Sequence, residues 1–148
     1  MKKYIGKVIT ALVLLISFAT LAFASQLQLL VPTTYVSAGT VQLANVLRSP
    51  NQGSITVITT IGTMSGVPTA QPIVQGITYS GTVYTLCTGN VISASNTQST
   101  ISVGAMLTAV SGVACNMPLP DQWNVKYIVT QSHVSDTISI GTDANTAQ

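Results

Sequence analysis

The residues that could do chemistry are few, and they gather around one imidazole. His133 is the only histidine of the 148-residue chain, so any mechanism that needs an imidazole must use it. Ser132 and Ser135 flank it and Asp136 follows, which supplies the residue types of a Ser-His-Asp triad. Catalytic serines of hydrolases commonly stand in a Gly-x-Ser-x-Gly elbow. These serines lack that frame, and the sequence therefore predicts a polar turn between two strands at residues 131–136.

Acidic residues are too scarce for most other catalytic or metal sites. The chain has three carboxylates, Asp121, Asp136 and Asp143, and no glutamate. Two of them adjoin predicted turns and Asp143 lies in a predicted tail, where Asp143-Ala144-Asn145 resembles a calcium loop without its glycine and closing glutamate. We therefore predict that the protein is not an enzyme and that it carries no cofactor and no metal.

Cys87 and Cys115 are the only cysteines. An even number of cysteines in an exported chain favours a disulfide. Their spacing is neither a Cys-x-x-Cys redox pair nor a zinc site, which would need four ligands. Closing the 29 residues from 87 to 115 would contribute about 3.5 kcal/mol on a loop-entropy argument.

Aromatic residues offer one candidate ligand surface. Trp123, close in sequence to Gln122, Asn124 and Tyr127, could stack on a sugar. The alternative is that a single tryptophan entering a strand packs into the core, which the usual burial of aromatic residues favours.

The distribution of charge excludes a nucleic-acid partner. Only 5 Lys or Arg and 3 Asp or Glu are present, and three of the lysines lie within the first seven residues. Beyond them Arg48 and Lys126 are the only cations. Two scattered cations cannot neutralise a row of phosphates.

Residues 1–24 have the features of a secretory signal peptide. Three lysines precede an apolar run over residues 8–23, and Ala22-Phe23-Ala24 places small residues at the two positions that signal peptidase inspects. We predict a hydrophobic signal helix, cleavage between Ala24 and Ser25, and a secreted chain at the cell surface that touches the membrane only before cleavage. An uncleaved anchor is disfavoured because the run is shorter than the ~20 residues that span a bilayer.

A type IV pilin that keeps its apolar helix is another alternative. Tyr4-Ile5-Gly6 followed by Lys7 loosely matches such a processing site. Ala11 stands where the bacterial pilins have a glutamate, and Pro32 would end the helix early.

After Ser25 the composition and periodicity are those of β-strands. Thr, Ser, Val, Ile, Gln and Gly dominate, and apolar residues alternate with polar ones. The predicted strands include residues 41–43, 55–57, 77–87, 101–109, 125–127 and 138–140, and the turn-forming clusters are 49–53, 62–72, 93–96, 116–120 and 131–136. Seven or eight short strands without an amphipathic helix predict an all-β fold, an antiparallel β-sandwich of immunoglobulin-like or jelly-roll type over residues 37–148.

Residues 25–36 form an apolar arm or strand in front of this domain. Leu27, Leu29, Leu30 and Val31 precede Pro32, and such an arm could lie along its own sheet or add to an open edge of the next subunit. In its leader, arm and small β-sandwich the chain resembles donor-strand filament subunits of prokaryotic cell surfaces. That resemblance implies a homopolymer, a pilus or matrix fibre built by strand exchange. The alternative is a monomeric extracellular module that binds carbohydrate through Trp123 and the region of Tyr79 and Tyr84.

Overall fold

The computed structural model describes residues 25–50, 52–105, 107 and 112–147. Ten β-strands and no helix occur among these residues, which confirms the all-β prediction. The predicted signal helix and the cleavage residue Ala24 lie outside the described residues.

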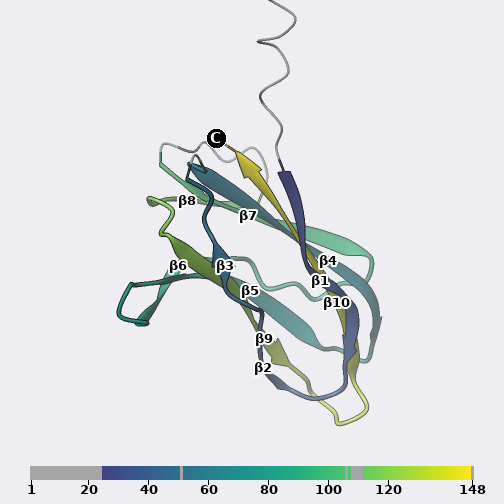
Figure 1. Ribbon diagram of the computed structural model, residues 1–148. Helices are drawn as coiled ribbons and strands as arrows, with labels where there is room; N and C mark the ends of the chain where they lie inside the picture. The colour runs from purple at the N-terminus through teal and green to yellow at the C-terminus, as the bar shows by residue number, and fades with distance from the viewer. Residues whose placement is uncertain (1–24, 51, 106, 108–111, 148) are drawn as a thin grey trace, which may run out of the picture.

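The strands form two five-stranded sheets that pack face to face as a β-sandwich (Figure 1). The first sheet has the order β1 (Ser25–Tyr35), β10 (Thr137–Ala147), β4 (Ser54–Ser65), β7 (Thr97–Gly104), β8 (Val113–Asn116). The second has the order β2 (Gly39–Gln42), β9 (Gln122–Thr130), β5 (Thr69–Ile77), β6 (Val83–Thr88), with β3 (Val46–Leu47) also paired to β9. All pairs are antiparallel except β7 with β8.

The strand order excludes one of the two predicted topologies. An immunoglobulin sheet has the order ABED, in which the first strand neighbours the second. Here β1 pairs with the last strand, β10, and β2 belongs to the opposite sheet. The immunoglobulin-like alternative is therefore wrong.

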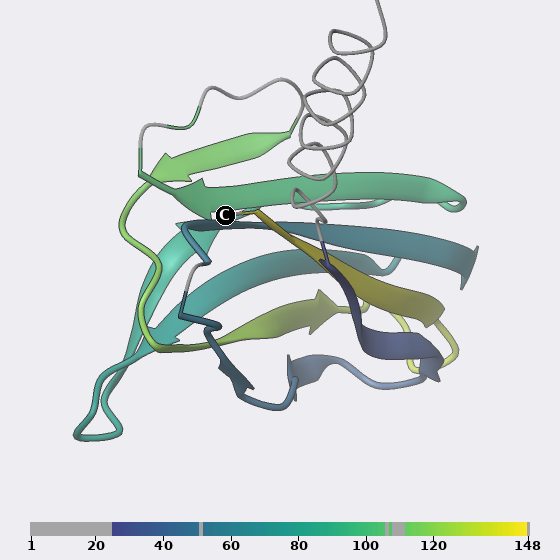
Figure 2. The same cartoon turned by 45° about the horizontal axis from the view of Figure 1, so that its top comes forward.

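The two ends of the sandwich carry different loops. Because Ile77 pairs with Gln122 and Thr69 with Thr130, the β5–β6 hairpin turn and the β9–β10 turn lie at opposite ends (Figure 2). The beginning of β1 and the end of β10 are side by side, since Ser25 pairs with Thr146.

A cluster of three hydroxyl groups joins the two sheets inside the core. Alternate residues of β9 point inward, and Trp123, Val125 and Tyr127 have no exposed surface. The Tyr127 hydroxyl shares hydrogen bonds with the hydroxyls of Thr59 (2.8 Å) and Thr142 (2.7 Å) in the facing sheet. Buried polar groups are costly unless they are paired, so this triplet fixes how the two sheets lie on each other.

Two predicted boundaries are wrong for local reasons. Residues 77–87 are not one strand, because residues 78–82 form a hairpin turn in which Gly81 has a φ of 83°. Residues 62–72 are not one turn: β4 continues to Ser65 and β5 begins at Thr69. Pro72 is tolerated within β5. Its carbonyl accepts the backbone N–H of Gly89, just beyond the end of β6. In a strand the N–H and the carbonyl of one residue point to the same side, so the missing N–H of Pro72 removes no hydrogen bond to β9.

Two further sequence predictions need correction. The described residues contain ten strands rather than seven or eight. The strand predicted over residues 101–109 ends at Gly104, and residues 106, 108 and 109 of that range lie outside the described residues.

Replacing Tyr127 by phenylalanine should destabilise the protein by roughly 1–3 kcal/mol, because the hydroxyls of Thr59 and Thr142 would stay buried without their partner. Urea unfolding measures this. Tyr79→Phe, at a fully exposed ring, is the matched control and should leave the midpoint unchanged. Equal midpoints for both variants would show that the hydroxyl cluster contributes nothing.

Stability should also fall at alkaline pH. Burial raises the pKa of Tyr127 above 10.0, although its hydrogen bonds to Thr142 and Thr59 act in the opposite direction. Above pH 10 the unfolded chain therefore releases this proton before the folded chain does, and the free energy of unfolding decreases with pH. Below pH 10 the contribution is fully present. Unfolding curves between pH 8 and about 11.5 should show this loss, and Tyr127→Phe should make the curve flatter.

Candidate functional site

The predicted polymerisation arm is the edge strand of its own sheet. In β1, Leu29 and Leu30 are half-buried against the core, whereas Leu27 is 40% exposed and Val31 is 64% exposed. Of the two arrangements that the sequence left open, the single chain adopts the one in which the arm lies along its own sheet, paired with β10.

The pairing of β1 with β10 is interrupted in its middle. The register shifts between Gln28 and Leu30 and again between Leu30 and Thr33, so Leu30, opposite Thr142, stands between a run of pairs at residues 25–28 and a second run at residues 33–35. Pro32, which has no N–H to donate, lies within the second interruption and packs against Gly141, where a Cβ would come within 3.2 Å of the proline ring. The two register shifts therefore fall on either side of Leu30, and the second one contains Pro32.

A disulfide closes the opposite side of the sandwich and confirms the predicted pair. Cys87 in β6 and Cys115 in β8 are joined, with their Cα atoms 5.8 Å apart. Since β6 and β8 belong to different sheets, the bond connects the sheets at the edge farthest from β1.

Changing both cysteines to serine should lower the free energy of unfolding by about 3.5 kcal/mol, the loop-closure contribution of the cross-link. Thermal unfolding of the double variant measures this. Alkylation of the native protein without reductant, followed by mass spectrometry, should find no modified thiol. Two modified thiols would contradict the bond.

His133 lies in a polar turn, as predicted, rather than in a catalytic triad. The buried Asp136 carboxylate accepts hydrogen bonds from the backbone N–H groups of Ser132 (3.0 Å) and His133 (3.1 Å). The His133 side chain is 74% exposed and its Nδ1 lies 3.8 Å from Asp136. The carboxylate thus holds the turn together, and it also packs against Gly66, where any Cβ would collide with it.

Metal-binding groups are equally sparse in the described part of the chain. No cluster of three His, Cys, Asp or Glu side chains forms there. Asp143 lies within β10, so the predicted tail is a strand and the calcium-loop resemblance has no structural counterpart. The same residues include no helix long and apolar enough to cross a membrane.

Trp123 is buried and cannot act as a sugar platform, which is the outcome that the burial argument favoured. Tyr127 is buried as well, and Asn124 donates its side-chain N–H to Asn45. Only Gln122 of that predicted surface reaches an accessible site.

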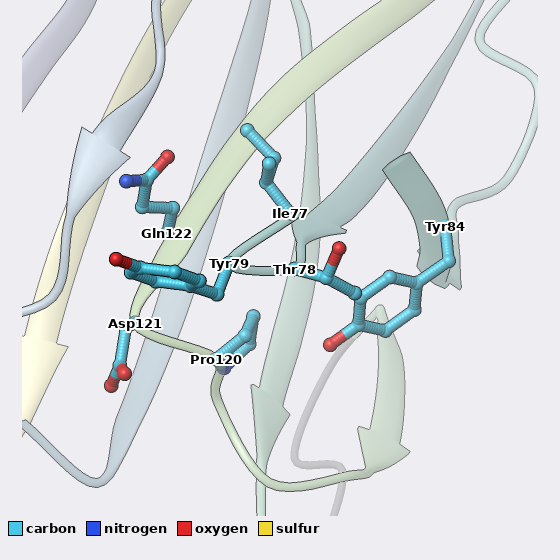
Figure 3. A pocket seen from close by; sticks show the side chains of 7 residues that line it. All are labelled: Ile77, Thr78, Tyr79, Tyr84, Pro120, Asp121 and Gln122. Carbon is cyan, nitrogen blue, oxygen red and sulfur yellow. The ribbon is translucent and has the colours of Figure 1, made fainter. Parts of the chain in front are cut away.

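That site is a hollow of about 280 Å³ beside the β5–β6 hairpin (Figure 3). Tyr79 and Tyr84, which the sequence also singled out, come from the turn and from β6, and the loop into β9 supplies the other side. The full lining is Ile77, Thr78, Tyr79, Tyr84, Pro120, Asp121 and Gln122. Sequence reasoning missed Pro120 and Asp121, because only the pairing of Ile77 with Gln122 brings them to the hairpin.

The walls of the hollow are held in place from outside it. Asp121 accepts a hydrogen bond from the Arg48 guanidinium at 2.8 Å. Tyr84 lies directly over Gly76, where a Cβ would fall within 3 Å of its ring. The absence of a side chain at Gly76 therefore makes room for Tyr84 at this position.

Comparison with known proteins identifies the fold and nothing finer. No protein-family model matches the chain, and no curated protein matches it. Solved structures do match. One is the Gx strain of infectious bursal disease virus, with a TM-score of 0.51 and 11% identity over 85% of this chain and 33% of that one. The T13 particle of the same virus has a TM-score of 0.54 and 11% identity over 86% of this chain and 31% of that one, and T=1 particles derived from the virus have a TM-score of 0.53 and 10% identity over 87% of this chain and 32% of that one. This chain spans about a third of the length of each. At such low identity the likeness shows that the chain shares their β-sandwich fold.

Proposed function

We propose that the chain is a secreted structural subunit that assembles with copies of itself into an extracellular filament by exchanging its N-terminal strand. The observation that carries the proposal is β1: an edge strand with an interrupted ladder, whose Leu29 and Leu30 nevertheless complete the core. The position that it fills beside β10 can be filled identically by the same segment of another copy.

The strand order and the structural neighbours support a self-assembling role. We infer that the sandwich is a jelly roll, with β1, β10, β4 and β7 facing β2, β9, β5 and β6. The neighbours with TM-scores above 0.5 include particles of a virus, and jelly rolls build many viral shells. In this proposal the fold provides a rigid packing unit rather than a catalytic scaffold.

The length of the linker limits how much of β1 can be exchanged. Between Tyr35 and Gly39 the extended chain spans at most about 14 Å. A sheet of five strands is on the order of 20–24 Å wide, and the nine residues of β9 extend about 30 Å. Because a body is wider and longer than this linker, the whole of β1 can change places only if the β10 edge of the neighbouring body lies within about 14 Å of Gly39.

The break at Pro32 allows a shorter segment to be exchanged. If only residues 25–31 are exchanged while residues 33–35 keep their own pairing with β10, the free linker from Val31 to Thr33 spans up to about 7 Å, so the β10 edges of neighbouring bodies must lie side by side in the filament. We therefore place the exchanged segment at residues 25–31, which contain Leu27, Leu29, Leu30 and Val31, and the hinge at Pro32.

The low charge of the chain is compatible with close packing of copies. Among residues 25–148 the only charged side chains are Arg48, Lys126 and the three aspartates, apart from the histidine. Arg48 pairs with Asp121, and Asp136 is buried within its own turn. Little electrostatic repulsion would oppose assembly.

Two engineered disulfides test both the exchange and the hinge. Gln26 pairs with Asn145 before the break, and Thr34 pairs with Ser139 after it. Oxidised Gln26→Cys/Asn145→Cys should stay monomeric by size exclusion and electron microscopy, because its arm is locked to its own sheet. Oxidised Thr34→Cys/Ser139→Cys should form filaments like the unmodified chain.

Gln26→Ser/Asn145→Ser is the control for the first pair and Thr34→Ser for the second, in which position 139 is already serine, and both variants should assemble. Filaments of the locked Gln26/Asn145 chain would disprove strand exchange. Loss of filaments in the locked Thr34/Ser139 chain alone would disprove the hinge at Pro32.

A further inference from the structure

The hollow beside the β5–β6 hairpin has the chemistry of a small-ligand site. We propose that it binds one or two rings of an uncharged glycan, with Tyr79 as the stacking platform and Gln122 and Asp121 as the hydrogen-bonding groups. This inference goes beyond assembly and does not depend on it. The hollow adjoins β6, which lies at the opposite edge of the sandwich from β1.

The lining combines an aromatic face with unused polar groups. The Tyr79 side chain is fully exposed, and in Figure 3 its ring lies beside Gln122, Asp121 and Pro120. Among the described residues the Gln122 amide makes no side-chain hydrogen bond, and Asp121 uses only Oδ1, toward Arg48. An apolar ring face flanked by a planar amide and a carboxylate matches a sugar ring, which has an apolar C–H face and hydroxyl groups along its edge.

The charge and size of the hollow narrow the ligand class. No Lys, Arg or His lines it, so nothing there would balance a phosphate or a carboxylate. The Asp121 charge is already compensated by Arg48, 2.8 Å away, which disfavours a cationic ligand. A volume of about 280 Å³ is slightly below the ~300–1,000 Å³ of pockets that hold drug-sized molecules, so one or two sugar rings suit it.

Hydrogen bonds within the turn brace the backbone that carries Tyr79. Within the turn the Thr78 hydroxyl contacts the Ser80 hydroxyl at 2.8 Å and accepts the Thr82 backbone N–H at 3.0 Å. Backbone bonds from Thr78 N–H to the Thr82 carbonyl and from Gly81 N–H to the Thr78 carbonyl complete the brace. Such a braced hairpin reduces the ordering cost of binding, which otherwise weakens small-ligand sites.

The test is a titration of the ¹⁵N-labelled full chain followed by NMR, with cellobiose, mannobiose and N,N′-diacetylchitobiose as probes at up to about 20 mM, enough for a millimolar Kd. At least one disaccharide should shift the amide signals of Tyr79, Tyr84 and Gln122. Tyr79→Ala and Gln122→Ala should each weaken that binding about tenfold or more, and Tyr79→Phe should keep most of it because stacking remains.

His133→Ala, which removes an exposed ring at the other end of the sandwich, is the matched control and should bind like the unmodified chain. Unfolding midpoints of all variants show that any loss is not loss of fold. No shift at the hollow with any probe, or unchanged binding in Tyr79→Ala, would overturn the proposal. A proline-rich peptide that shifts these signals when no disaccharide does would overturn it in favour of a protein partner.

Discussion

Strand β10 needs a hydrogen-bonding partner along each of its two edges. Its inward residues Ile138, Ile140 and Ala144 are buried, and β4 supplies one ladder along nearly its whole length. Without β1 the other edge would expose unpaired backbone groups and uncover the core that Leu29 and Leu30 reach. The fold therefore requires a strand beside β10. In the single chain this strand is β1, which is connected to β2 by three residues, 36–38. The pairing of β1 with β10 shifts register around Pro32.

The rest of the sandwich is tied together at sites away from that edge. Tyr127 joins the sheets through Thr59 and Thr142, and the bond between Cys87 and Cys115 joins them at the far side. The body from β2 to β10 therefore has its own cross-connections, whereas residues 25–28 pair with one strand only, β10. In proteins, local stability follows such differences in contact. The proposed strand exchange requires such a body, together with an edge strand that another copy could supply.

The sequence predicted the features that depend on periodicity, and it failed where distant strands meet. Alternation gave the all-β class and most strands, and the two cysteines gave the disulfide. Residues 77–87 alternate in the same way on both sides of Gly81, so periodicity alone could not reveal the turn. The hollow could not be predicted from the sequence for a related reason. Tyr79 and Asp121 are 42 positions apart in the sequence, and they come together only because β5 pairs with β9. The burial of Trp123 followed from ordinary residue preferences.

Exchange of residues 25–31 between copies is the central claim, and a cross-link between chains tests it most directly. A Gln26→Cys chain and an Asn145→Cys chain are mixed, assembled and oxidised, so that neither can form this bond within itself. The two Cα positions are partners in the ladder between β1 and β10. Strand exchange predicts covalent heterodimers on a non-reducing gel from assembled material and none from monomers. Assembled material that yields no heterodimer would contradict it.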